Sequence, residues 1–581
     1  MLSVFLSDGQ VFQGLLRPGV LAILISTVVG ISYTVYRIIN LRRPIQGIPY
    51  NQKAARHLLG DVPEFLAAAD GKTWWAIQGL KHKSPIVQIF MRPFGRPWVV
   101  ITDPLEAVDI CLRRTKEFDR SDETAAFFHG VMPLHHVCLK TLDPQFKKNR
   151  DLVNELMAPS FTHEVAAPQI YQNVMSLMTL FEKKVELSKS LPFDASEDIH
   201  QATLDTIMGV SFGLGDETSQ ISKKIASLAP KIDETHQDRF EFEPVGLDPE
   251  LRAFTVLADS LAIAIESPAP GIHHFLYRNL SPTMRQAAAS RDRIRARETK
   301  KSIERKLAGR PLRCALDQVL AREDAIAERE GRKPDYNSKI IFDELMGFLI
   351  GGHETMSSIL RWGPKFINDD QRVQATLRKA LHEAYPQAKA EARVPTLTEI
   401  LKTQVPYLEA TIEEIMRYTM PSPTLFRDTI IDSEILGYKI PKGTTLLFLA
   451  NGPGFMMPSV PVSEEKYRNA GSAQRGHIGT FDDSDITKFL PERWLKTRKS
   501  GKGAEEVFFD ANAGPALAFG VGPRACFGKR LALVQIRIYF TLLIWSFELQ
   551  GLPPQLAAHE DYWSLSRIPK HVYLNLRKAA F

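Results

Sequence analysis

Hydrophobic residues recur along most of the chain with the three- and four-residue spacing of amphipathic helices. Helical patterns cover residues 149–157, 170–185, 199–210, 337–362, 370–384, 398–420 and 529–547. Short apolar runs typical of strands are fewer and cover residues 86–91, 98–102, 434–440 and 444–449. The pattern predicts a mainly α domain with a small β region, which we treat as one unit over residues 51–581.

One apolar stretch, residues 19–36, carries no charge at all. As a helix its eighteen residues would span about 27 Å, close to the roughly 30 Å hydrocarbon core of a bilayer. Arg37, Arg42 and Arg43 follow, and the positive-inside bias places everything after them in the cytosol. We therefore expect a lumenal segment over residues 1–18, a single-pass transmembrane anchor over 19–37 and a proline-containing linker over 38–50, with the protein in the endoplasmic reticulum membrane. A cleaved signal peptide and a buried core helix are the alternatives.

Composition narrows the function only a little. The 581 residues are 44% hydrophobic with a formal net charge of +6, and basic residues are interspersed with acidic ones, so no nucleic-acid footprint emerges. The cysteines, Cys111, Cys138, Cys314 and Cys526, form no CxxC pair, which argues against a zinc site or a disulfide framework. Only Cys526 has a distinctive neighbourhood.

Residues 519–528 read FGVGPRACFG around Cys526. Glycines permit a tight loop, Arg524 offers a fixed cation to a carboxylate, and the helix expected after Gly528 places the sulfur near a helix N-terminus, which favours the thiolate. An isolated cysteine is more often inert and buried. The segment, however, resembles the haem-binding signature F-x-x-G-x-R-x-C-x-G of the cytochrome P-450 family, from Phe519 to Gly528.

That resemblance implies the cytochrome P-450 fold and haem b as cofactor, with Cys526 as the axial iron ligand. Phe519 and Gly352 would contact the haem, and Arg524, Arg150 and Arg427 are candidates for its two propionates. Arg150 belongs to F-x-x-x-R, which resembles the family's W-x-x-x-R with phenylalanine in place of tryptophan.

Further motifs follow in the order that the family shows. Glu414 and Arg417 match E-x-x-R, and Arg493 in the segment Pro-Glu-Arg-Trp would join them in a structural network, with Trp494 where phenylalanine is usual. The alternative for E-x-x-R alone is an ordinary surface pair of neighbouring helical turns.

The segment Gly351-Gly352-His353-Glu354-Thr355 lies inside a long predicted helix. Two helical glycines cost about 1 kcal/mol each relative to alanine. The resemblance implies a widened turn there that accommodates dioxygen, with Thr355 as its hydrogen-bond donor and Glu354 relaying protons. A glycine packing contact beside a solvated Glu–Thr pair is the alternative. His353 occupies a variable position and is expected to have no role.

The resemblance implies a monooxygenase that hydroxylates or epoxidises an apolar small molecule with dioxygen, taking NADPH-derived electrons from a separate reductase. Within that family, the sequence most resembles membrane-anchored fungal members that act in secondary metabolism. Phe127 and Phe426 are candidates for an apolar pocket, and Lys147 and Lys529 for docking an acidic reductase. One rival is a haem protein of the same fold that catalyses rearrangement or dehydration.

The other rival is an esterase with Ser211 as nucleophile, because residues 209–213 match G-x-S-x-G. That motif needs a strand before the serine. Residues 199–210 have a helical pattern instead, so we reject the esterase.

Overall fold

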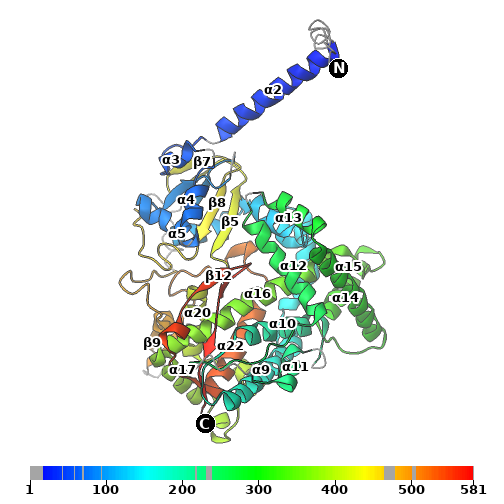
Figure 1. Ribbon diagram of the computed structural model, residues 1–581, viewed down its shortest axis with the longest axis vertical. Coiled ribbons are helices and arrows are strands. Elements are labelled where there is room, and N and C mark those ends of the chain that lie inside the picture. The colour runs from blue at the N-terminus through cyan, green and yellow to red at the C-terminus, as the bar shows by residue number, and fades with distance from the viewer. Residues whose placement is uncertain are drawn as a thin grey trace, which may run out of the picture.

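Helices make up most of the computed structural model of the protein, and a small mixed sheet lies to one side of the main helical body (Figure 1). It describes residues 18–41, 43–57, 59–68, 71–92, 95–215, 219–230, 238–267, 269–463, 478–499 and 505–579. The helices are α2 (Pro18–Leu41), α3 (Gln52–Ala55), α4 (Val62–Ala67), α5 (Gly71–His82), α6 (Pro104–Leu112), α7 (Asp122–Phe128), α8 (Pro144–Val153), α9 (Ala167–Ser188), α10 (Ser196–Phe212), α11 (Gln220–Ser227), α12 (Pro249–Ile265), α13 (Pro270–Leu280), α14 (Pro282–Leu307), α15 (Ala315–Glu330), α16 (Lys339–Asp369), α17 (Gln371–Ala384), α18 (Pro386–Ala390), α19 (Leu397–Lys402), α20 (Pro406–Thr419), α22 (Lys529–Ser546) and α23 (Pro554–Ala557).

The largest sheet has five strands in the order β1-β2-β8-β5-β3. Its β2 and β8 are parallel and its other pairs antiparallel, and the pairing of β3 with β5 sets Arg120 opposite Arg427. The strands are β1 (Ile86–Ile89), β2 (Trp98–Ile101), β3 (Phe118–Arg120), β4 (Phe193–Asp194), β5 (Thr424–Thr429), β6 (Ser433–Ile435), β7 (Tyr438–Ile440), β8 (Thr445–Leu449), β9 (Leu495–Lys499), β10 (Glu505–Phe509), β11 (Phe547–Leu549), β12 (Asp561–Trp563), β13 (Arg567–Pro569), β14 (Tyr573–Leu574) and β15 (Leu576–Lys578). The predicted mainly α class with a small β region is confirmed.

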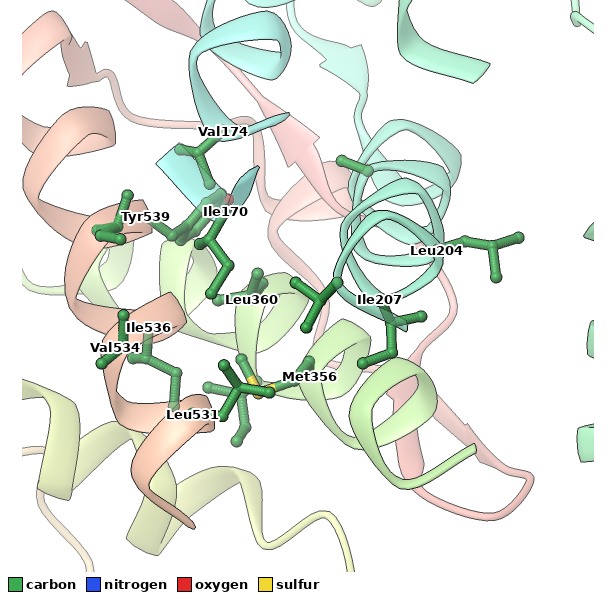
Figure 2. Close-up of a cluster of buried hydrophobic side chains, with 14 of the residues drawn as sticks. Ile170, Val174, Leu204, Ile207, Met356, Leu360, Leu531, Val534, Ile536 and Tyr539 are labelled. Carbon is green, nitrogen blue, oxygen red and sulfur yellow. The ribbon is translucent and has the colours of Figure 1, made fainter. Parts of the chain in front are cut away.

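The main hydrophobic core lies where α9, α10, α16 and α22 meet. Ile170 of α9, Ile207 of α10, Met356 of α16 and Leu531 of α22 converge there (Figure 2). Because Met356 adjoins Thr355 and Leu531 follows Cys526 closely in sequence, this packing brings together two segments that are far apart along the chain. The core therefore positions the candidate site.

Two sequence predictions are wrong in detail. The helix predicted over 398–420 is divided into α19 and α20, because Pro406 occupies the first turn of α20 and cannot continue an earlier helix. The strand predicted over 434–440 is the hairpin of β6 and β7. Its turn residues Leu436 and Gly437 have φ values of 50° and 81°, the left-handed conformation that tight hairpins require.

The helix expected near the N-terminus is present as α2, which projects from the body (Figure 1). However, among the helices of the described residues, none combines the length and apolar composition needed to cross a bilayer. The predicted transmembrane anchor over 19–37 is thus not supported. Residues 1–17 of the predicted lumenal segment lie outside the described residues, and the cellular location and domain limits stay predictions.

Candidate functional site

Cys526 lies in the loop between a 3-10 helix (Gly522–Arg524) and the start of α22, and its side chain is exposed. Its backbone N–H donates to the carbonyl of Phe519 at 2.7 Å, which closes the loop. Gly522 has a φ of 75°, and a Cβ there would lie 2.2 Å from the carbonyl oxygen of Cys111, so only glycine fits. The loop therefore presents one accessible sulfur, as the sequence predicts.

Opposing influences act on the pKa of that sulfur. Partial burial raises the pKa of the Cys526 thiol, although the backbone N–H of Gly528 and the cation of Arg150 act in the opposite direction. A coordinated metal deprotonates a thiol outright, so the exposed sulfur suits a metal-bound group.

Arginines from three segments converge beside this loop. Arg427 of β5 and Arg524 are buried, at 3% and 9% exposure, and Arg120 of β3 is half-buried. Burial lowers the pKa of Arg524 to about 10 and that of Arg120 well below its ordinary range, and in both cases neighbouring arginine charges add to the effect. Such crowding of buried cations is unfavourable without anions to bind them.

Each arginine of this group also has a buried nitrogen without a hydrogen-bond partner among the described residues. These are Nε of Arg120, Nε of Arg524 and a terminal nitrogen of Arg427. Unpaired donors of buried cations are costly, and carboxylates are their usual partners. The cluster fits the two propionates of haem, and Arg120 is a member that sequence reasoning missed because no motif marks it.

Arg150 of α8 lies beside the cysteine loop. Its guanidinium stacks 4.6 Å from the ring centroid of Phe527, and Arg524 stacks 4.2 Å from that of Phe146. Phe146, which replaces the tryptophan of the family pattern, thus supports Arg524 through its ring face. The structure therefore places all three sequence-predicted arginines, Arg150, Arg427 and Arg524, near the loop.

On α16, the structure revises the role of the paired glycines. The helix is continuous from Lys339 to Asp369, so the widened turn predicted at Gly351 and Gly352 is absent from this fully described range. A Cβ on Gly352 would lie 2.5 Å from Cδ1 of Ile207, whereas a Cβ on Gly351 would meet nothing within 4 Å. Gly352 thus permits close packing of α10 on α16, and Gly351 faces open space.

Thr355 and Glu354 differ sharply in environment. The hydroxyl of Thr355 donates to the carbonyl oxygen of Gly351 at 2.6 Å on the accessible side of α16. Glu354 is 2% exposed, and its Oε2 has no hydrogen-bond partner among the described residues. Burial raises the pKa of Glu354 to about 7, and the charge of Asp259 adds to the rise while Arg361 opposes it. A carboxyl with such a pKa can both donate and accept a proton near neutrality.

The predicted structural network is confirmed beneath the site. Glu414 is fully buried and contacts Arg417 at 2.7 Å and Arg493 at 3.2 Å. The indole Nε1 of Trp494 donates to the second carboxylate oxygen of Glu414 at 2.9 Å. These side chains bind one another, so they hold the fold together and are unavailable for chemistry.

Other candidates lose their support. Ser211 is buried in the last turn of α10, so a helix and not a strand leads directly into it, and the rejection of the esterase is confirmed. Phe127 and Phe426 pack against each other with ring centroids 6.0 Å apart in a buried cluster with Trp98, so they are core residues. His353, expected to have no role, is buried next to Glu354.

Comparisons with known proteins identify the family of this chain. The sequence profile described as Cytochrome P450 matches residues 59–452 and 484–576. A protein of Fusarium sporotrichioides named cytochrome P450 monooxygenase TRI13 is 36% identical over 573 residues, covering 93% of this chain and 96% of its own. Cytochrome P450 monooxygenase xilC of Penicillium rubens is 32% identical, with 94% of each chain covered. The solved haem domain of cytochrome P450DA superposes with a TM-score of 0.66 at 18% identity, over 92% of this chain and 99% of that one.

Proposed function

This chain belongs to the cytochrome P450 family and is a monooxygenase, and from that premise we propose that it hydroxylates or epoxidises an apolar small molecule of fungal secondary metabolism. The electrons come from NADPH through a separate reductase. The observation that carries the proposal is the exposed sulfur of Cys526 beside buried arginines with unpaired donors.

The residues present fit haem b. Cys526 would ligate its iron, and Arg120, Arg427 and Arg524 would hold its propionates, with Arg150 next to the loop. When bound, haem supplies the iron that activates dioxygen, a reaction the protein side chains cannot perform alone. Hydrophobic residues of the main core flank the cysteine loop, among them Phe519, Phe527 and Leu531, which favours apolar substrates.

The protein's own contribution to the chemistry is the handling of protons. Glu354 holds a proton at its buried carboxyl near neutral pH. Thr355, the next residue, presents a hydroxyl on the accessible side of the helix that can orient dioxygen and pass on the proton. Proton transfer by such positioned groups typically contributes about 10²–10⁴-fold to a rate.

Electron delivery requires a docking surface for the reductase. Lys147 and Lys148 on α8 and Lys529 and Arg530 at the start of α22 are exposed. Both helices adjoin the cysteine loop, so this basic surface lies on the thiolate side. We assign this basic surface to the docking of an acidic reductase. Its charges would raise the association rate of the reductase more than they would raise its affinity.

The decisive experiment is the carbon monoxide difference spectrum of the reduced full-length protein. The wild type should show the red-shifted Soret band typical of thiolate ligation, and Cys526→Ser should lose it. Cys138→Ser, which alters the half-buried cysteine next to Arg524's acceptor Leu139, is the control and should keep it. A wild-type spectrum without the red-shifted band would refute the proposal.

A further inference from the structure

Two histidines lie behind Glu354 in a row that no motif of the sequence marks. His353 Nδ1 is 3.9 Å from Glu354 Oε1, and the rings of His353 and His200 have centroids 4.5 Å apart. The ligand-type atoms of His200, His353 and Glu354 all lie within 4.8 Å of one another. His200 comes from α10, so the row connects two helices that pack closely at Gly352.

Burial increases along this row toward the carboxyl. His200 is half-buried, whereas His353 is 4% exposed and Glu354 is 2% exposed. Nε2 of His353 and Oε2 of Glu354 are buried without a hydrogen-bond partner in the part of the chain that the structure describes. Unpaired polar groups in a core are unfavourable, so their presence calls for a function.

Burial, helped by neighbouring charges, keeps both rings neutral. Burial lowers the pKa of His353 to about 4, and Arg361 adds to the effect while a hydrogen bond to the backbone of His200 opposes it. Burial lowers the pKa of His200 to about 2, and His353, Arg361 and Lys224 add to the effect. A neutral imidazole has one N–H and one bare nitrogen, so it can accept a proton on one side and release another.

We propose that His200 and His353 form a proton path that carries protons from solvent to Oε1 of Glu354. A proton binds Nε2 of His353 while the proton on its Nδ1 passes to the carboxylate through one water, because 3.9 Å is too long for direct transfer. The imidazole ends neutral and no electrons move. Ser357, whose Oγ lies 3.4 Å from Nδ1 of His200, orients the outer ring. The proposal rests on the monooxygenase function, because that function requires protons at Glu354 and Thr355.

The same three side chains could in principle bind a divalent metal, but the structure favours the proton path. Ligand atoms of a tetrahedral zinc lie about 3.4 Å apart, given bonds of about 2.0–2.1 Å, and the 3.9 Å between His353 and Glu354 exceeds this. The cation of Arg361 also faces His200, His353 and Glu354. A fixed positive charge at this position opposes the binding of a dication.

The test uses infrared spectroscopy of the full-length haem-loaded protein after transfer into D2O. The stretching band of the protonated Glu354 carboxyl, identified by its loss in Glu354→Gln, shifts as the proton exchanges. The exchange rate should fall at least about tenfold in His353→Gln and in His200→Gln, because glutamine cannot relay a proton. His382→Gln, on α17 and also half-buried with an unpaired Nε2, should exchange at the wild-type rate.

Equal exchange rates in wild type, His353→Gln and His200→Gln would overturn the proposal. Stoichiometric zinc in the purified protein, lost in His200→Gln, would also overturn it in favour of a metal site. A normal carbon monoxide spectrum in both variants separates failure of the path from failure of the monooxygenase assignment. As a second readout, NADPH-driven dioxygen consumption with added reductase should show a larger solvent isotope effect in His353→Gln than in the wild type.

Discussion

The indole of Trp494 donates a hydrogen bond to the carboxylate of Glu414 at 2.9 Å. Both side chains are almost completely buried, and the carboxylate also binds Arg417 and Arg493. Phenylalanine, which the family pattern has at position 494, has no such donor. This chain therefore has an additional hydrogen bond at a buried ionic network.

Trp494→Phe should lower the free energy of unfolding by about 1.5–3 kcal/mol, the range for a hydrogen bond to a charged group. The measurement is the denaturant midpoint of the haem-loaded protein. Trp545→Phe is the matched comparison, because Trp545 donates to the neutral carbonyl of Arg393 at 3.1 Å and should lose only about 0.5–1.5 kcal/mol. Equal losses in the two variants would contradict the role of the charge.

Gly352→Ala should destabilise the protein by about 1–3 kcal/mol, despite the better helix propensity of alanine, because its Cβ would press on Ile207. The double variant Gly352→Ala/Ile207→Val removes the methyl group that clashes and should recover part of the loss. Thermal unfolding of the single and double variants measures both effects. If Gly352→Ala were as stable as the wild type, the packing role of this glycine would be refuted.

Arg120→Gln should weaken haem retention about 10- to 100-fold, as expected for one lost charge-assisted hydrogen bond of about 1.5–3 kcal/mol. In the same variant, the protein expressed without added haem precursor should become more stable, because one repelling buried cation is gone. Soret absorbance measures the expected loss of haem, and thermal unfolding measures the expected gain in stability of the haem-free protein. Arg56→Gln, at an exposed position, is the control and should change neither.

Glu354 should make the stability of the protein fall as the pH rises. Its pKa is 4.5 in the unfolded chain and about 7 in the native state, so between these values the native state binds more protons. The stabilising contribution is complete below pH 4.5 and is lost as the pH approaches 7. At pH values above 7, the free energy of unfolding of Glu354→Gln should therefore exceed that of the wild type by up to roughly 3 kcal/mol. Denaturant titrations across this pH range measure the free energy of unfolding of the wild type and of Glu354→Gln. If the prediction were wrong, the two free energies would change with pH in parallel.

Thr355→Ala should uncouple NADPH oxidation from substrate oxidation, because it removes the hydroxyl next to Glu354 while leaving electron delivery intact. Hydrogen peroxide released per NADPH should rise, and Thr355→Ser, which keeps the hydroxyl, should stay close to the wild type. Unchanged peroxide release in Thr355→Ala would remove Thr355 from the proton pathway.

The sequence alone determined the parts of this protein that depend on near neighbours. Cys526 could be identified because its loop needs glycines and an arginine within a few residues, and α16, α20 and α22 because their apolar spacing repeats each turn. Interruptions of a helix or a strand that depend on one residue were harder to predict. Examples are the division of a helix at Pro406 and the hairpin turn at Gly437.

Only the tertiary structure decided which distant side chains meet. Arg120 joins Arg427 through the pairing of β3 with β5, and His200 joins His353 through the packing of α10 on α16. Gly352 looked like a place for dioxygen and proved to be the contact that lets those two helices approach. Such juxtapositions follow from the shapes of packed surfaces over long sequence separations, which no local pattern records.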